Sequence, residues 1–251
     1  MQKKNLILIN VPHSSTYIPT EELKYFNTHD LKHEIDVMTD HFCDDLYDTG
    51  DTMVRFPISR LVCDPERFRN DIDEIMSVVG MGAIYTACSD GSKLKSVSIE
   101  HKEELLIRYY DRYHREFERA VAQKLDEFGK CLIIDAHSFY SEPLPYEFDQ
   151  SQGRPDICIG TDDYHTPREV LEVLYGFWNG RGYSVEINRP FAGCIVPIRY
   201  YRKDPRVMSV MIEINRRLYI DHEINKTDGY ERVKRDITEV VGILRDQGTS
   251  F

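Results

Sequence analysis

The chain has 251 residues and a mass of 29.5 kDa, and 41% of its residues are hydrophobic and 30% charged. A chain of this size and balance folds as a globular protein, which excludes disorder or a fibrous structure as a description of the whole. It carries 43 acidic against 32 basic residues, a net charge of -11, which argues against nucleic acid or an anionic membrane as a partner because phosphate groups are bound by clustered lysine and arginine.

Hydrophobic patterning predicts strands and helices that alternate along the chain. The runs Asn5–Val11 and Cys131–Asp135 are apolar and rich in β-branched residues, as in strands buried on both faces. In chain order we expect a strand over 5–11, a short helix from 20, a helix over 30–47, strands over 52–56 and 60–64, a helix over 98–128, strands over 131–135 and 156–160, a helix over 166–180, strands over 184–187 and 206–214, and a helix over 230–247. With no internal repeat and no linker, this order favours a single α/β domain over residues 1–251, with a mixed, mostly parallel sheet flanked by helices.

Residues 68–97 have no regular hydrophobic pattern and contain many Asp, Ser and Gly residues. A stretch this long without its own strand or helix is uncommon in a compact domain and usually serves function. We therefore expect residues 68–97 to form an active-site loop or a lid.

Cysteine usage and hydropathy indicate the compartment. The six cysteines form no CxxC pair, and in a chain of this length they do not describe a disulfide framework. No apolar run approaches the roughly 20 residues of a membrane span. The expected location is the reducing cytoplasm, with no membrane partner.

Two of the predicted buried strands run directly into a histidine, His13 in the first case and His137 in the second. Ligands of open α/β sheets collect beyond the carboxyl ends of the strands, so both histidines can face one pocket. Asp36, Asp40 and Asp44 are spaced four apart on the helix expected after the first strand. Two histidines and one carboxylate are a common ligand set of hydrolytic zinc, and the alternative is that each histidine only caps a turn.

The last predicted strand carries Glu213 inside an apolar run. A buried carboxylate without a partner is costly, so Glu213 is either paired or catalytic. Burial would raise its pKa toward the range of a general base. The alternative is an ion pair with a nearby arginine, for which the candidates are Arg199, Arg216 and Arg217.

A charged cluster surrounds the strand expected over 60–64. Its members are Arg60, Asp64, Arg67 and Arg69. Guanidinium groups pair bidentately with carboxylates, so the arginines could clamp a carboxylate substrate, and the alternative is a structural Asp–Arg pair.

Other chemistries have less support from the sequence. Ser14, Ser15 and Ser138 lie beside histidines, but no GxSxG motif accompanies them. A P-loop and a GxGxxG motif are also absent, so nothing indicates a nucleotide cofactor. His114 lies among aromatic residues of a predicted helix, as expected of a hydrogen-bonded core histidine.

Nine short segments, in order from residue 11 to residue 220, resemble the N-formylglutamate amidohydrolase family. The first resembles a strand that ends in Pro-His-Ser-Gly, and a later one resembles Asp-x-His-Ser. The segments are Val11–Ser15, Thr39–Asp40, Asp44–Tyr47, Ser59–Arg67, Tyr113–His114, Asp135–Ser138, Pro155–Gly160, Asn188–Gly193 and Ile212–Ile220.

The resemblance implies a phosphorylase/hydrolase-like α/β fold, related to zinc carboxypeptidases. It implies a metal-dependent amidase that releases formate from N-formyl-L-glutamate, late in histidine degradation. The implied metal ligands are His13, Asp40 and His137, for Zn²⁺ or another divalent transition metal, with Glu213 as the general base. The implied substrate-binding residues are Arg60, Arg67, Asn188 and Arg199.

Three positions depart from the family pattern. Ser15 and Cys194 each replace a glycine, and Glu66 stands where the family has an asparagine. We expect Glu66 near the substrate, where its charge would repel a dicarboxylate. Two alternatives therefore stay open: a zinc amidase or peptidase acting on another N-acyl amino acid or a cell-wall peptide, and an inactive relative that only binds a ligand.

Overall fold

The computed structural model of the chain describes residues 5–28 and 30–248, and in them six strands form one sheet. The strands are β1 (Ile7–Val11), β2 (Thr52–Arg55), β3 (Cys131–Phe139), β4 (Ile157–Gly160), β5 (Val185–Ile187) and β6 (Val207–Asn215). Their order across the sheet is β2-β1-β3-β6-β4-β5, and neighbours are parallel except for β4 and β6. The expectation of a mixed, mostly parallel sheet is confirmed.

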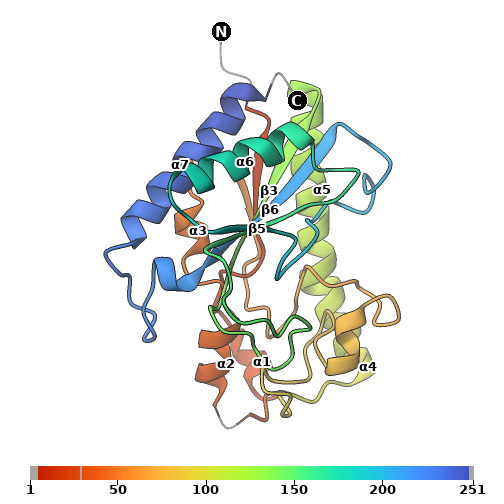
Figure 1. Cartoon of the computed structure of the whole chain (residues 1–251). Helices are drawn as coiled ribbons and strands as arrows, with labels where there is room; N and C mark the ends of the chain where they lie inside the picture. The colour runs from red at the N-terminus through yellow and green to blue at the C-terminus, as the bar shows by residue number, and fades with distance from the viewer. Residues whose placement is uncertain (1–4, 29, 249–251) are drawn as a thin grey trace.

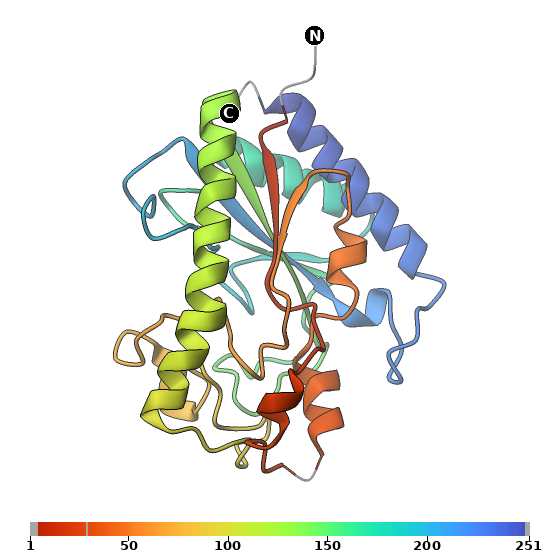
Figure 2. The ribbon, with the colours of Figure 1, turned by 180° about the vertical axis from the view of Figure 1, so that it is seen from behind.

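Helices cover both faces of the sheet. They are α1 (Thr20–Leu23), α2 (Leu31–Met38), α3 (Cys43–Leu46), α4 (Ile99–Leu105), α5 (Asp111–Phe128), α6 (Arg168–Gly180) and α7 (Tyr230–Gln247), with short 3₁₀-helices η1 (Ile75–Val79) and η3 (Arg216–Leu218) and a π-helical turn η2 (Leu106–Tyr110) that joins α4 to α5. Figure 1 shows α6 and α7 on one face, and Figure 2 shows α5 along the other. Among the described residues, no helix combines the length and the apolar character of a membrane span.

The continuous apolar runs are explained by this arrangement, because side chains on both faces of a strand meet a helix layer. Ile7 and Ile9 of β1 belong to the hydrophobic cluster that contains Trp178 of α6. Leu8, which points to the opposite face, belongs to the cluster that contains Phe117 of α5.

The helix expected over 30–47 is wrong, because the chain breaks it into α2 and α3. Phe42 has a left-handed backbone conformation with φ of 63°, which no α-helix accepts. Between the two helices, the backbone N–H of Asp40 donates to the carbonyl oxygen of His13 at 2.9 Å. The break therefore ties Asp40 to the carboxyl end of β1.

The strand expected over 60–64 is also wrong. The N–H groups of Val62 and Cys63 both donate to the carbonyl oxygen of Ser59, which closes a turn. The segment is still buried, and this burial rather than strand pairing explains its apolar residues.

Gly160, the last residue of β4, allows the segment after β5 to cross close above it. A Cβ atom on Gly160 would lie 2.2 Å from the carbonyl oxygen of Gly193 and 2.4 Å from Cε of Met211. We expect Gly160→Ala to destabilise the fold by about 1–3 kcal/mol or more, through overpacking. Urea unfolding measures this, with Gly242→Ala in α7 as the control. A Cβ at residue 242 meets nothing within 4 Å, so the control should gain about 0.5–1 kcal/mol.

Candidate active site

Three neighbouring strands bring their buried polar residues together at one end of the sheet. His13 follows β1, His137 lies in β3 and Glu213 lies in β6, in register with His137. Cα partners in a sheet present their side chains to the same face, so His137 and Glu213 are adjacent. The ring centroids of His13 and His137 are 5.1 Å apart, and all three side chains are buried.

Asp40 completes the group from the break between α2 and α3. Its Oδ2 atom lies 3.1 Å from Nδ1 of His137 and 3.7 Å from Nδ1 of His13. Its other oxygen, Oδ1, accepts a hydrogen bond from Arg216 at 2.9 Å. One carboxylate oxygen therefore faces both histidines while the second is held by an arginine.

The far ring nitrogens of both histidines are held by carboxylates. Nε2 of His13 lies 2.8 Å from Oδ1 of Asp64. Nε2 of His137 lies 3.1 Å from Oδ1 of Asp135 and 2.9 Å from Oε2 of Glu66. With a cation between the rings and Asp40, these contacts would keep the proton of each neutral ring on Nε2 and leave each Nδ1 lone pair for the cation.

The donor set fits a divalent cation. Among the described residues, Nδ1 of His13 and Oε2 of Glu213 are fully buried without a hydrogen-bond partner, which is costly unless another group meets them. Five carboxylates and three guanidinium groups line the site, so its carboxylates outnumber its guanidinium groups. These groups are Asp40, Asp64, Glu66, Asp135 and Glu213, and Arg60, Arg67 and Arg216.

A second set of ligands is conceivable, because His13, Glu66 and His137 also offer ligand atoms within 4.8 Å of one another. Glu66, however, already accepts hydrogen bonds on both oxygens, from Asn10 and from His137. The Nδ1 side has the unpartnered atom, so we prefer the set of His13, Asp40 and His137.

Burial and charge shift the pKa values in this cluster. Burial alone would raise the pKa of Asp40, but its contacts with His13 and His137 and the charge of Arg216 hold it well below its usual range. Burial alone would lower the pKa of His137, but Glu66 and Asp135 raise it well above its usual value. Burial raises the pKa of Glu213 to about 8, although the charge of His137 opposes this. Glu213 is thus poised to exchange a proton near neutral pH.

Arg60 and Arg67 lie beside this cluster. Nε and Nη2 of Arg60 donate to Oδ2 of Asp64 at 3.1 and 2.7 Å. Nε of Arg67 donates to the carbonyl oxygen of Met81 at 3.3 Å. Within the described chain, Nη1 of Arg60 and Nη2 of Arg67 make no hydrogen bond, so each arginine keeps a free donor for an anionic ligand.

Residues 68–97 form part of the wall of the site. The hydroxyl of Tyr85 donates to Oδ2 of Asp64 at 2.6 Å, and Met81 holds Arg67 as described. In Figure 1 this segment lies at the same end of the sheet as α1 and α2. Its opening and closing as a lid stays a prediction.

Asn188 and Arg199 are not brought to this cluster. Strand β5 runs parallel to β4 and therefore opposite to β6, so its carboxyl end points away from the histidines. The side chain of Asn188 bonds to the backbone and hydroxyl of Thr161. Arg199 is 67% exposed and pairs with Glu118 of α5.

Three further expectations meet a different outcome in the structure, and one, for His114, agrees with it. Glu66 faces His137 and Asn10 rather than the free donors of the arginines. Asp36 and Asp44 pair with Lys32 and Arg55 at the surface, away from Asp40. Arg216 pairs with Asp40 and not with Glu213, so its role at the site was missed. His114 donates to the carbonyl of Pro65, as expected of a satisfied core histidine.

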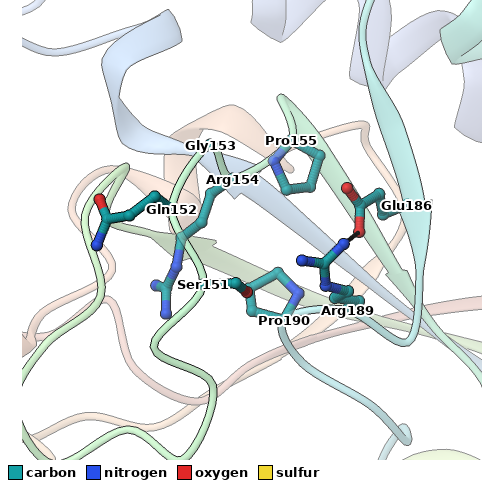
Figure 3. A pocket seen from close by; sticks show the side chains of 8 residues that line it. All are labelled: Ser151, Gln152, Gly153, Arg154, Pro155, Glu186, Arg189 and Pro190. Carbon is teal, nitrogen blue, oxygen red and sulfur yellow. Dashed lines mark hydrogen bonds and ion pairs between the residues drawn. The ribbon is translucent and has the colours of Figure 1, made fainter.

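A small pocket of about 10 Å³ lies between the loop over 151–155 and the end of β5, outside this cluster. Figure 3 shows the ion pair between Arg189 and Glu186 on its rim. Arg154, which also lines it, is paired with Glu147. The charges of this pocket are already balanced, and its volume suits little more than one water molecule.

Residues 6–220 match the family model described as N-formylglutamate amidohydrolase. The chain is 26% identical to the N-formylglutamate deformylase of Pseudomonas aeruginosa over 225 residues, which cover 86% of this chain and 83% of that protein. It is 28% identical over 181 residues to the N-formylglutamate deformylase of Pseudomonas putida, which cover 69% of this chain and 66% of that protein.

Two solved structures share the fold. The N-formylglutamate amidohydrolase of Ralstonia eutropha JMP134 superposes with a TM-score of 0.87 at 20% identity, over 99% of this chain and 95% of that one. A gene product of Agrobacterium tumefaciens superposes with a TM-score of 0.72 at 16% identity, over 99% and 93%.

Proposed function

Because the chain belongs to the N-formylglutamate amidohydrolase family, we propose that it is a metal-dependent amide hydrolase that releases formate from N-formyl-L-glutamate. One observation carries this proposal. Two buried polar atoms without a hydrogen-bond partner, Nδ1 of His13 and Oε2 of Glu213, lie at the same site. If the cluster bound no ligand, both atoms would stay buried without a hydrogen bond, which lowers the stability of the fold.

We propose that His13, Asp40 and His137 hold the metal. Imidazole and carboxylate ligands suit Zn²⁺, and also Mn²⁺, Co²⁺ or Fe²⁺. When bound, such an ion supplies a Lewis acid and lowers the pKa of a coordinated water. Asp64 and Asp135 fix the rings from behind, so that both Nδ1 atoms are presented without rearrangement.

We propose that Glu213 is the general base. Its carboxylate takes a proton from the attacking water as the water oxygen bonds to the formyl carbon. As the C–N bond breaks, Glu213 returns that proton to the leaving nitrogen, which gives formate and glutamate. A pKa of about 8 suits both transfers, because the group gains and loses a proton near neutral pH.

We propose that the free donors of Arg60 and Arg67 bind the carboxylates of the substrate. Arg67 is the cleaner test, because its hydrogen bonds go to backbone carbonyl oxygens. Its removal therefore leaves no carboxylate without a hydrogen-bond donor. We expect Arg67→Gln to raise KM about 10–100-fold, the loss of a charge-assisted hydrogen bond, with a smaller change in kcat. Arg199→Gln is the matched control. If KM rises in the control and not in Arg67→Gln, the substrate carboxylate is not bound by Arg67.

Hydrolysis of three compounds, followed by release of formate or acetate, tests the function itself. N-Formyl-L-glutamate is the expected substrate, and N-formyl-L-glutamine tests the need for the side-chain carboxylate. N-Acetyl-L-glutamate tests the size of the acyl pocket through acetate release. Faster turnover of the acetyl compound, or of a cell-wall peptide, would replace the proposed substrate. No turnover of any compound by metal-loaded protein would favour an inactive ligand-binding relative.

A further inference from the structure

Position 66 carries a glutamate whose side chain does not point toward the substrate side of the site. Oε2 of Glu66 lies 2.9 Å from Nε2 of His137, and Oδ1 of Asp135 lies 3.1 Å from the same nitrogen. One imidazole N–H is therefore shared by two carboxylates, of which Asp135 is buried and Glu66 is 12% exposed. We call them the carboxylate clamp (Glu66 and Asp135).

The amide of Asn10 holds the clamp together. Its Nδ2 donates one hydrogen bond to Oε1 of Glu66 and one to Oδ1 of Asp135, both at 2.9 Å. Its Oδ1 accepts from the hydroxyl of Tyr113, which fixes which end of the amide faces the carboxylates. The N–H of Ile195 donates to the last oxygen, Oδ2 of Asp135. Each of the four carboxylate oxygens thus accepts at least one hydrogen bond.

One turn of the chain presents a carboxylate to each histidine. Asp64 meets His13, and Glu66, two residues later, meets His137. The backbone N–H of Glu66 donates to Oδ1 of Asp64 at 2.9 Å, and His114 bonds to the carbonyl of Pro65 between them. Asp64 therefore anchors the backbone of Glu66, while Asn10 and His137 hold its side chain.

We propose that Glu66 is a positioning residue for metal binding. As the second carboxylate of the clamp, it holds the ring of His137 with Nδ1 toward Asp40. It also makes Nδ1 a stronger electron-pair donor to the metal ion. The inference rests on the metal site proposed above. Two negative charges behind the ring polarise it more than one does, and burial of the clamp keeps water from screening them.

An amide cannot replace the carboxylate at this position. In Glu66→Gln, the side-chain NH₂ group must face either Nδ2 of Asn10 or the N–H of His137, and both are donors. One hydrogen bond of the clamp is lost in either orientation, together with the negative charge. Glu66→Asp keeps the charge on a shorter side chain.

Zinc affinity measured by competition with a chelator tests the proposal. We expect Glu66→Gln to raise the Kd for Zn²⁺ about 10–100-fold. Glu66→Asp should fall between Glu66→Gln and wild type, because it retains the charge. Glu142→Gln, an exposed residue outside the site, should leave the Kd unchanged. Thermal unfolding of the metal-free proteins gives a second readout, in which a merely structural role would lower the melting temperature without changing the Kd.

The outcomes separate this inference from the proposed function. If Glu66→Gln binds Zn²⁺ within twofold of wild type while His137→Ala does not bind it, the metal site stands and the role of Glu66 is refuted. If wild type itself binds no metal, the proposed function fails first. If Glu66→Gln does not fold, the Kd of Glu66→Asp decides: a Kd above that of wild type supports the role of Glu66, and a Kd equal to that of wild type refutes it.

Discussion

Glu213→Gln is expected to reduce kcat by about 10²–10⁴-fold while the metal stays bound. The amide keeps the size of the side chain but cannot accept a proton from water. Glu213 lies within the β3–β6 ladder, near its carboxyl end and in register with His137, so the substitution leaves the backbone pairing intact. Formate release and metal content, measured on the same sample, give the two numbers. Unchanged activity would remove Glu213 from the reaction.

The pH dependence of stability gives an independent control on the same variant. Because burial raises the pKa of Glu213 from 4.5 to about 8, the metal-free folded protein holds a proton in this range that the unfolded chain releases. Its stability therefore falls as pH rises from about 4.5 to 8. The Gln variant lacks this loss, so it should gain stability relative to wild type on going from pH 5 to pH 8.5. Equal pH profiles would mean that Glu213 is solvated rather than buried.

His137→Ala is expected to reduce bound metal from about one equivalent per chain to near zero and to abolish hydrolysis. The substitution removes one of two imidazole ligands and also leaves Glu66 and Asp135 without their shared donor. Elemental analysis of purified protein measures the result. His222→Ala, a change of the same type at an exposed position, should retain the metal.

Metal at the wild-type level in both His13→Ala and His137→Ala would show that the ion binds elsewhere. No metal in wild type after reconstitution would leave the family membership intact and reduce the chain to a ligand-binding member of it.

The central strands β1, β3, β4 and β6 were predictable because their apolar runs are buried, so local composition reports the tertiary environment directly. His13 and His137 were predictable as neighbours for the same reason, since parallel strands end at one edge of the sheet. Hydrophobic pattern alone therefore gave the frame of the candidate site.

The position of Asp40 was not predictable from periodicity. Helical spacing grouped it with Asp36 and Asp44, but α2 ends before Asp40 and the left-handed turn at Phe42 follows it, so the three do not share one helix. That turn depends on a contact between Asp40 and His13, which are 27 positions apart, and no local pattern records it. Arg216 was missed for the same reason, because its partner Asp40 is 176 positions away in the sequence.

The direction of β5 explains why Asn188 was placed at the site from its motif but lies elsewhere. Strand order and direction are set by how α6 returns the chain to the sheet, and the sequence of the strand itself carries no sign of direction. A residue at the end of a strand thus indicates a site only once the direction of that strand is known.

The single antiparallel pair has a consequence for how the family can diversify. Because β4 runs against β6, the connection over 140–156 leaves β3 and enters β4 at the same end of the sheet. It needs no crossover, so it can lengthen, shorten or change composition without disturbing strand register. Mutation can therefore remodel the surroundings of the candidate active site through this one connection, without altering the ladder that carries His137 and Glu213.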